Sequence, residues 1–314
     1  MQFQILKLSE TVNFMKLRFP AMIFSTLLIV GSIASLAVNQ LNWGLDFTGG
    51  TVIQVNYPDG ANLELIRAEL TEANFPDAVV QNFGSSQEVL IRVAPRDDLQ
   101  AEVIGDMVLA ALKADVPNVE MQRIEFVGPN VGEELTEQGG LAMLVALICI
   151  LIYVAMRFEY RFALGSVGAL AHDVIITLGL FSILQLEFDL TVLAALLAVI
   201  GYSLNDTIVV SDRIRENFRK VRKGGPEEII NISLTQTLNR TIVTSLTTIL
   251  VLLALFFKGG ALIHGFATAL LFGVFIGTYS SVYIASSVAL FLGISKEDLM
   301  PPEVEKEGED LEPL

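Results

Sequence analysis

The sequence predicts a polytopic α-helical membrane protein with one α+β domain between its first two spans. Of its 314 residues, 53% are hydrophobic and only 18% are charged, and the mean hydropathy is +0.59. This balance argues against a soluble enzyme of the same length. Six apolar stretches are long enough to cross a hydrocarbon layer of ~30 Å, which takes about 20 helical residues. A long acidic segment separates the first stretch from the other five.

The predicted spans are residues 20–38, 139–157, 162–184, 190–211, 240–257 and 264–293. The first resembles a signal peptide, but its leading segment and its apolar run are too long, so we expect a retained helix. The last is long enough for a tilted span and some interfacial helix. Residues 1–19 precede the spans, and residues 294–314 form an acidic tail that we expect to be disordered.

Basic residues predict which ends of the spans lie inside the cell. Lys16 and Arg18 precede the first span, Arg157 and Arg161 lie between the second and third, and six Lys or Arg residues follow the fourth. Six crossings place all of these on one side, and short basic loops stay cytoplasmic. We therefore expect both termini inside and residues 42–138 outside. No basic patch occurs beyond these loops, so we expect no nucleic acid partner.

Residues 42–138, here called the α+β domain, carry 17 acidic and 5 basic residues. Their pattern predicts strands at 51–57, 78–84, 88–93 and 119–128 and helices at 62–73 and 97–115. The order β-α-β-β-α-β is the ferredoxin-like arrangement, which implies no function by itself.

The sequence lacks the common catalytic, metal-binding and phosphate-binding motifs named below. The α+β domain contains no His and no Cys, and the whole chain has one cysteine, Cys149, in the second span. Neither an HExxH nor a GxSxG motif is present, and no glycine-rich phosphate loop follows a strand. We therefore expect no enzyme, no metal site and no cofactor.

Asp206 and Arg240 place charges inside the apolar layer. A carboxylate there costs roughly 3 kcal/mol on insertion scales, so intramembrane acids are functional by default. Arg240 is expected in the first turn of the fifth span, at a depth similar to that of Asp206. A carboxylate balanced between desolvation and a nearby guanidinium is suited to exchanging a proton. The alternatives are a static buried ion pair and an interfacial arginine that reaches toward the headgroups.

His172 and Asp173 fall near the midplane of the third span. They suit a proton relay or a hydrogen bond between helices. Adjacent residues do not share a helix face, so we expect one to face the fourth span and the other to face elsewhere. Asn205 and Thr244 add polar groups that suit a hydrated path or simply join helices.

Two junctions connect the α+β domain to its flanking spans, "NWGLDFTGGT" (42–51) and "FVGPNVGEEL" (126–135). Their glycines allow tight turns with positive φ, and Asp46 is expected to cap or pin the first junction. A domain held at both roots can swing as a body. The expected hinge residues are Gly44, Asp46, Gly49, Gly50, Gly128 and Pro129.

Five segments of the chain resemble those of a known protein family. They are the two junctions, "ALAHDVIITLGLFS" (169–182), "GYSLNDTIVVSDRIRENFR" (201–219) and "NRTIVTSLTT" (239–248). They are similar, in the same order, to the SecF family of the bacterial SecDF protein-export complex. That family is related to the RND superfamily of proton-driven transporters. The similarity runs from the first span to the sixth.

The resemblance implies a six-span inner-membrane subunit with a periplasmic domain, which works with SecD beside the SecYEG channel. It implies that the proton-motive force helps to draw an unfolded secretory polypeptide across the membrane, with protons and lipids as further partners. It also implies that Asp206 and Arg240 belong to the proton pathway. Two alternatives stay open: a passive scaffold for SecD, and an RND-like transporter of a small molecule or lipid.

Overall fold

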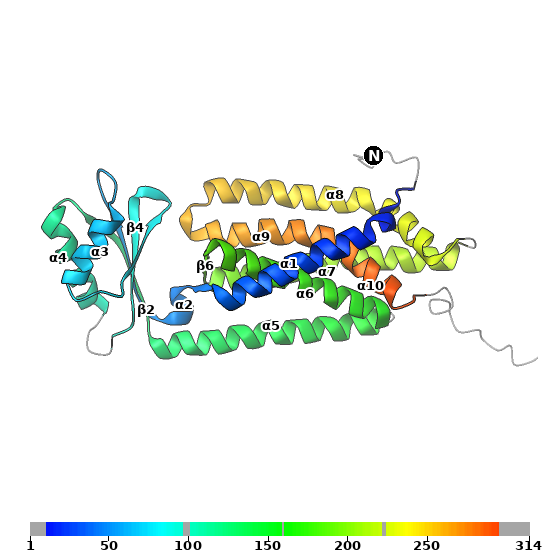
Figure 1. The fold of residues 1–314 in the computed structure, drawn as a ribbon, viewed down its shortest axis with the longest axis horizontal. Helices are drawn as coiled ribbons and strands as arrows, with labels where there is room; N and C mark the ends of the chain where they lie inside the picture. Colours follow the sequence, from blue (N-terminus) through cyan, green and yellow to red (C-terminus); the bar gives the residue numbers. More distant parts are fainter. Residues whose placement is uncertain (1–10, 97–100, 159, 222–223, 295–314) are drawn as a thin grey trace, which may run out of the picture.

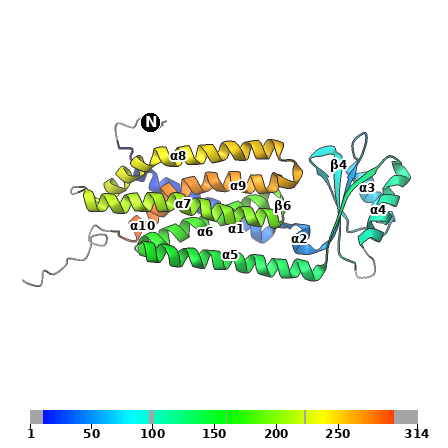
Figure 2. The same ribbon diagram turned by 180° about the vertical axis from the view of Figure 1, so that it is seen from behind.

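A computed structural model describes residues 11–96, 101–158, 160–221 and 224–294. Long helices form an elongated bundle, and the α+β domain lies at one end of it (Figures 1 and 2). Within the described ranges, six helical segments are long and apolar enough to cross a membrane. The first of them begins, and the last ends, at the end of the bundle remote from the α+β domain (Figure 1). The predicted disordered tail lies outside the described residues, except for its first residue.

The bundle helices follow the predicted spans but extend beyond several of them. A 3₁₀ turn, η1 (Phe14–Leu17), leads into α1 (Arg18–Val38), and the last span ends in a π-helical turn, η2 (Ser281–Ala285), and a short helix, α10 (Ser286–Phe291). The remaining long helices are α5 (Pro129–Arg157), α6 (Tyr160–Leu184), α7 (Leu190–Lys220), α8 (Pro226–Lys258) and α9 (Ala261–Ser280).

The helix that carries Arg240 begins well before the predicted span, because α8 starts at Pro226 rather than at residue 240. Hydropathy marks only the part of a helix that crosses lipid, whereas Pro226 at the first helical position and two acidic residues in the first turn favour an earlier start. Arg240 therefore lies in the middle of α8, and its backbone is already inside a continuous helix.

Two helices form the centre of the bundle. About half of the apolar window of α6 and α7 is buried within this chain, against 11% for α1 and α5. The outer helices α1, α5 and α8 therefore leave most of their apolar side chains exposed on the surface of this chain. In a membrane protein such faces contact lipid or another subunit.

The α+β domain consists of β2 (Gly50–Asn56), α3 (Leu63–Glu72), β3 (Val79–Phe83), β4 (Ser85–Val93), α4 (Ala101–Asp115) and β5 (Glu120–Val127). Its sheet is antiparallel throughout, in the order β3-β4-β2-β5. Helices α3 and α4 cover the face remote from the bundle (Figure 1) and bury the main core, which includes Ile53, Leu70 and Ile91. The face toward the bundle holds a smaller cluster, Leu45, Val52 and Leu90.

Three short elements connect the domain to the bundle. The first junction contains β1 (Asn42–Trp43) and α2 (Leu45–Thr48), and the turn between α6 and α7 contains β6 (Glu187–Phe188). Strands β1 and β6 pair in parallel. The chain that leaves α1 is therefore hydrogen-bonded to the chain that enters α7.

We expect Gly179→Ala to separate α1 from α6. A Cβ atom at Gly179 would lie 2.3 Å from Ser32 Cβ and 2.8 Å from Ser32 Cα on α1, so backbone must move. Overpacking of this kind costs about 1–3 kcal/mol. Thermal unfolding of the chain in detergent should show a lower midpoint for the variant.

Gly168→Ala on the same helix is the matched control. A Cβ atom there has no neighbour within 4 Å, and alanine favours the helix over glycine. Equal unfolding midpoints for the two variants would contradict the close approach of α1 and α6.

Candidate functional site

The bundle interior contains two buried carboxylates, Asp173 on α6 and Asp206 on α7, which are 1% and 4% exposed. An ionised carboxylate in such surroundings needs donors or a counter-charge. The two residues meet this requirement in different ways.

Asp173 is held by side chains from three helices. Ser203 Oγ on α7 donates to Asp173 Oδ2 at 2.6 Å, and Ser280 Oγ on α9 donates to the same oxygen at 2.8 Å. His172 Nδ1 lies 2.9 Å from Asp173 Oδ1. Gly277, one turn before Ser280, leaves the space that these groups occupy. Asp173 therefore joins α6, α7 and α9.

His172 lies beside Asp173 rather than on a separate path. The expectation that the two side chains face different neighbours holds only in part, because the imidazole bends back to Asp173 while its ring stacks on Tyr279 of α9. The Tyr279 hydroxyl donates to Ala21 O and lies 3.0 Å from Ser25 Oγ, both on α1. This polar cluster thus reaches from α7 to α1. His172 Nε2 is buried and has no hydrogen-bond partner among the described residues.

Asp206 has a charge partner but an unsatisfied oxygen. It lies three residues after Ser203, on the same face of α7. The Arg240 guanidinium on α8 interacts electrostatically with the Asp206 carboxylate. Asp206 Oδ2 is nevertheless buried without a hydrogen-bond partner in the described part of the chain, as are the hydroxyls of Thr207 and Thr241. Orphaned polar atoms therefore occur on both α7 and α8, next in the chain to Asp206 and Arg240.

The other two predicted pathway residues do not join these clusters. Asn205 is exposed on the surface of this chain, because one helical residue rotates its side chain away from that of Asp206. Thr244 donates to the carbonyl oxygens of Arg240 and Thr241 in its own helix. Ser280 and Tyr279 were missed by the sequence reasoning. The only sequence signal for them is the run of hydroxyl residues "TYSSVYIASS" at the end of the last span.

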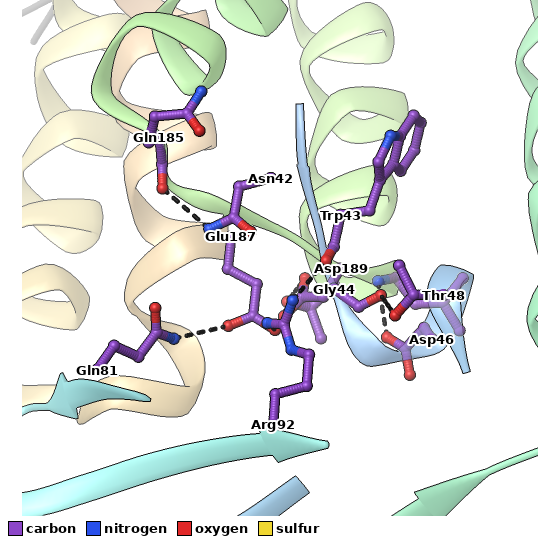
Figure 3. A network of polar contacts seen from close by, with 12 residues as sticks. Asn42, Trp43, Gly44, Asp46, Thr48, Gln81, Arg92, Gln185, Glu187 and Asp189 are labelled. Atoms are coloured by element: carbon purple, nitrogen blue, oxygen red, sulfur yellow. Dashed lines mark hydrogen bonds and ion pairs between the residues drawn. The ribbon is translucent and has the colours of Figure 1, made fainter. Parts of the chain in front are cut away.

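A third polar cluster lies at the junction between the α+β domain and the bundle (Figure 3). Asp46 Oδ2 accepts a hydrogen bond from Leu190 N at 2.9 Å, and Asp189 Oδ1 accepts one from Val192 N at 2.8 Å. Both carboxylates therefore cap the N-terminus of α7, where the helix dipole favours negative charge. Asp46 connects the first junction directly to the helix that carries Asp206.

The junction glycines act in two different ways. Gly49 and Gly50 have φ of +66° and +118°, which other residues rarely adopt. Gly44 and Gly128 have ordinary negative φ values of −70° and −63°, so the expected need for positive φ does not apply to them. Gly44 is instead restricted by close approach, since a Cβ atom there would lie 3.0 Å from Asp189 Cβ.

The two roots of the domain touch each other. A Cβ atom at Gly49 would lie 3.0 Å from Pro129 Cα, and one at Gly132 on α5 would lie 2.9 Å from Gly49 N. The chain therefore enters and leaves the domain at one place, so the two covalent connections of the domain lie side by side. Among the described residues, no group of three or more His, Cys, Asp or Glu is placed to hold a metal ion.

Together these features define a multi-pass membrane protein with buried intramembrane charges and one extramembrane domain. Two family models match the chain. One, described as protein export membrane protein SecD/SecF, C-terminal, matches residues 107–295, and the other, described as the SecD/SecF GG motif, matches residues 34–57 across the first junction.

Curated relatives match over nearly the full chain. A protein translocase subunit SecF from Vibrio alginolyticus is 61% identical over 313 residues, which cover 99% of both proteins. A protein of the same name from Escherichia coli O157:H7 is 50% identical over 303 residues, which cover 96% of this chain and 94% of that protein. The chain therefore belongs to the SecF family of protein translocase subunits.

A solved structure shows the same arrangement. The crystal structure of SecDF, a translocon-associated membrane protein from Thermus thermophilus, matches with a TM-score of 0.84 at 39% identity. The match covers 92% of this chain and 39% of the longer SecDF chain.

The pH dependence of folding should report the environment of Glu187. Burial raises the pKa of Glu187 above its ordinary value of 4.5, and the guanidinium of Arg92 lowers it by less. The folded chain therefore binds this proton more tightly than the unfolded chain. The stabilisation of the folded chain that comes from this tighter proton binding by Glu187 is fully present below pH 4.5. It is lost as the pH rises through the raised pKa.

We expect Glu187→Gln to remove this loss, so that the stability of the variant relative to the native chain increases as the pH rises above 4.5. Thermal unfolding in detergent over a pH series measures the difference. Glu64→Gln, at an exposed position of α3, is the control for the loss of a carboxylate as such. A Glu187→Gln curve parallel to the native one at all pH values would refute the assignment.

Proposed function

We propose that this chain uses the proton-motive force, as part of a SecDF-type complex, to assist translocation of secretory proteins through the SecYEG channel. Family membership supports the translocation role. The observation that carries the coupling to protons is Asp206, which is buried, feels the charge of Arg240, and has an orphaned oxygen. A carboxylate with no fixed donors on one oxygen can change its protonation state without breaking a packed network.

The proton path proposed here runs along the inner faces of α6, α7 and α8. Asp206 is the proton carrier and Arg240 sets its charge balance, while His172 and Asp173 form the second group, connected through Ser203 on α7. Asn205 and Thr244 lie outside these two groups and are peripheral members that add polar side chains to the path. No covalent chemistry is required, so the chain acts without being an enzyme.

The orientation of the chain in the membrane and its partner subunit follow from the charges of its loops and from its family. The basic last turns of α5 and α7, which contain Arg157, Arg219 and Lys220, lie at the end remote from the acidic α+β domain (Figure 2). The rule that basic loops stay inside places both termini in the cytoplasm and a ferredoxin-like domain in the periplasm of a bacterial inner membrane. The chain matches only part of the longer SecDF chain, so SecD supplies the rest of the working unit.

Asp206→Asn should abolish the gradient-dependent part of export, because asparagine keeps the shape of the side chain but does not titrate. The assay is translocation of a secretory protein into inverted membrane vesicles that contain SecD and SecYEG, with and without a proton gradient. Asp212→Asn on the same helix is the matched control, since that carboxylate is 38% exposed and pairs with Arg157.

Gradient-dependent export that persists with Asp206→Asn, in a complex that assembles normally, would exclude the proton role. A passive scaffold for SecD would then be the better description. Gradient-dependent movement of a small molecule or lipid, without an effect on secretory proteins, would instead indicate an RND-like transporter.

A further inference from the structure

Among the described residues, an ion pair connects the α+β domain to the bundle in addition to the two covalent roots. Arg92 on β4 donates to Glu187 Oε1 at 2.5 Å and to Trp43 O at 2.7 Å. Glu187 belongs to β6, in the turn between α6 and α7, and Gln81 on β3 lies 3.5 Å from its other oxygen. Figure 3 shows Arg92 and Gln81 reaching from the sheet to this carboxylate. Two strands of the domain therefore meet one residue of the bundle.

The interface around this ion pair is hollow. A cavity of about 550 Å³ separates the sheet from the outer end of the bundle. Val52, Leu90 and Arg123 line it from the domain, and Phe256, Leu262 and His264 line it from α8 and α9. The main core of the domain lies on the opposite face of the sheet, under α3 and α4. Movement of the domain away from the bundle would therefore leave that core intact.

Burial works against the charge of the Glu187 carboxylate in this ion pair, whose Arg92 and Glu187 side chains are 13% and 29% exposed. Burial raises the pKa of Glu187, and the nearby Asp189 and Asp46 carboxylates add to this, so the attraction of Arg92 does not fully offset the cost of the buried charge. Arg123, Glu125 and His264 face the same cavity from β5 and α9. A partly buried ion pair whose desolvation opposes its attraction can fix a geometry without strongly stabilising it.

Glu187 is also connected to the intramembrane site. It lies directly before α7, whose first turn is capped by Asp189 and by Asp46 of the first junction. The same helix carries Ser203 and Asp206. A displacement of α7 would therefore move Glu187 relative to Arg92.

We propose that Arg92 and Glu187 form a releasable latch that positions the α+β domain on the bundle and opens during each cycle of export. This inference rests on the proposed function, because it assigns the contact through which α7 acts on the domain. Both are positioning residues, and neither contacts the secretory polypeptide in this role.

The position of the domain tests the latch directly. Spin labels at Glu72→Cys on α3 and Lys258→Cys on α8, in a Cys149→Ser background, report the distance between domain and bundle by double electron–electron resonance. We expect Arg92→Glu to broaden the distance distribution, because two carboxylates then face each other. Combining it with Glu187→Arg should restore the native distribution. Arg123→Glu, which makes the same charge change on the cavity wall, is the control and should leave the distribution unchanged.

A locked latch tests its release. Cysteines at positions 92 and 187, joined by a reducible bis-maleimide linker in the complete complex, should abolish gradient-dependent export in vesicles, and reduction should restore it. An unchanged distance distribution with Arg92→Glu, or full export with the linker in place, would overturn the latch. If the latch variants behave as expected while Asp206→Asn leaves export intact, the proton role fails and the latch stands.

Discussion

The burial of two carboxylates in an apolar bundle is the constraint on which the rest of this structure depends. Each must be stabilised from within the protein, because lipid offers no donors. Asp173 receives hydrogen bonds from Ser203 and Ser280, which come from two other helices. These contacts require small residues between the helices, and Gly277 provides the space. One satisfied carboxylate thereby sets the spacing of α6, α7 and α9, while Asp206 keeps an unsatisfied oxygen.

Helix α7 brings the functional parts of the molecule together. Its N-terminus is capped by Asp189 and Asp46 at the junction, and its middle carries Ser203 and Asp206. An α-helix is stiff along its axis over this length, so a change near Asp206 reaches the junction as a movement of the whole element. The pairing of β1 with β6 ties the root of the α+β domain to the same end of α7. The domain and the intramembrane charges therefore share one mechanical element.

The sequence contains enough information for the spans and for the strands and helices of the α+β domain, because both depend on local hydrophobic period. It does not contain the contacts that define the site. Arg92 and Glu187 are far apart in the chain, and each is a single charged residue between apolar neighbours, so nothing local pairs them. Strands β1 and β6 are two residues each, too short to show a period of two. The extension of α8 to Pro226 was available from its cap residues, and the outward position of Asn205 from the rotation per helical residue. The partnership of Ser280 with Asp173 follows only from how α9 packs on α6.

A domain that changes position in each cycle needs two positions within a few kcal/mol of each other. A packed apolar interface would prevent this, because burial stabilises by about 25 cal/mol per Å² and an interface of several hundred Å² would hold the domain in one place. The hollow interface avoids that stabilisation, and the core under α3 and α4 makes the domain independent of its contact with the bundle. What remains among the described residues is the Arg92–Glu187 ion pair with its neighbouring hydrogen bonds, in which the cost of burying Glu187 opposes the attraction of Arg92. Weakness at this contact is therefore what allows a small rearrangement at α7 to decide where the domain lies.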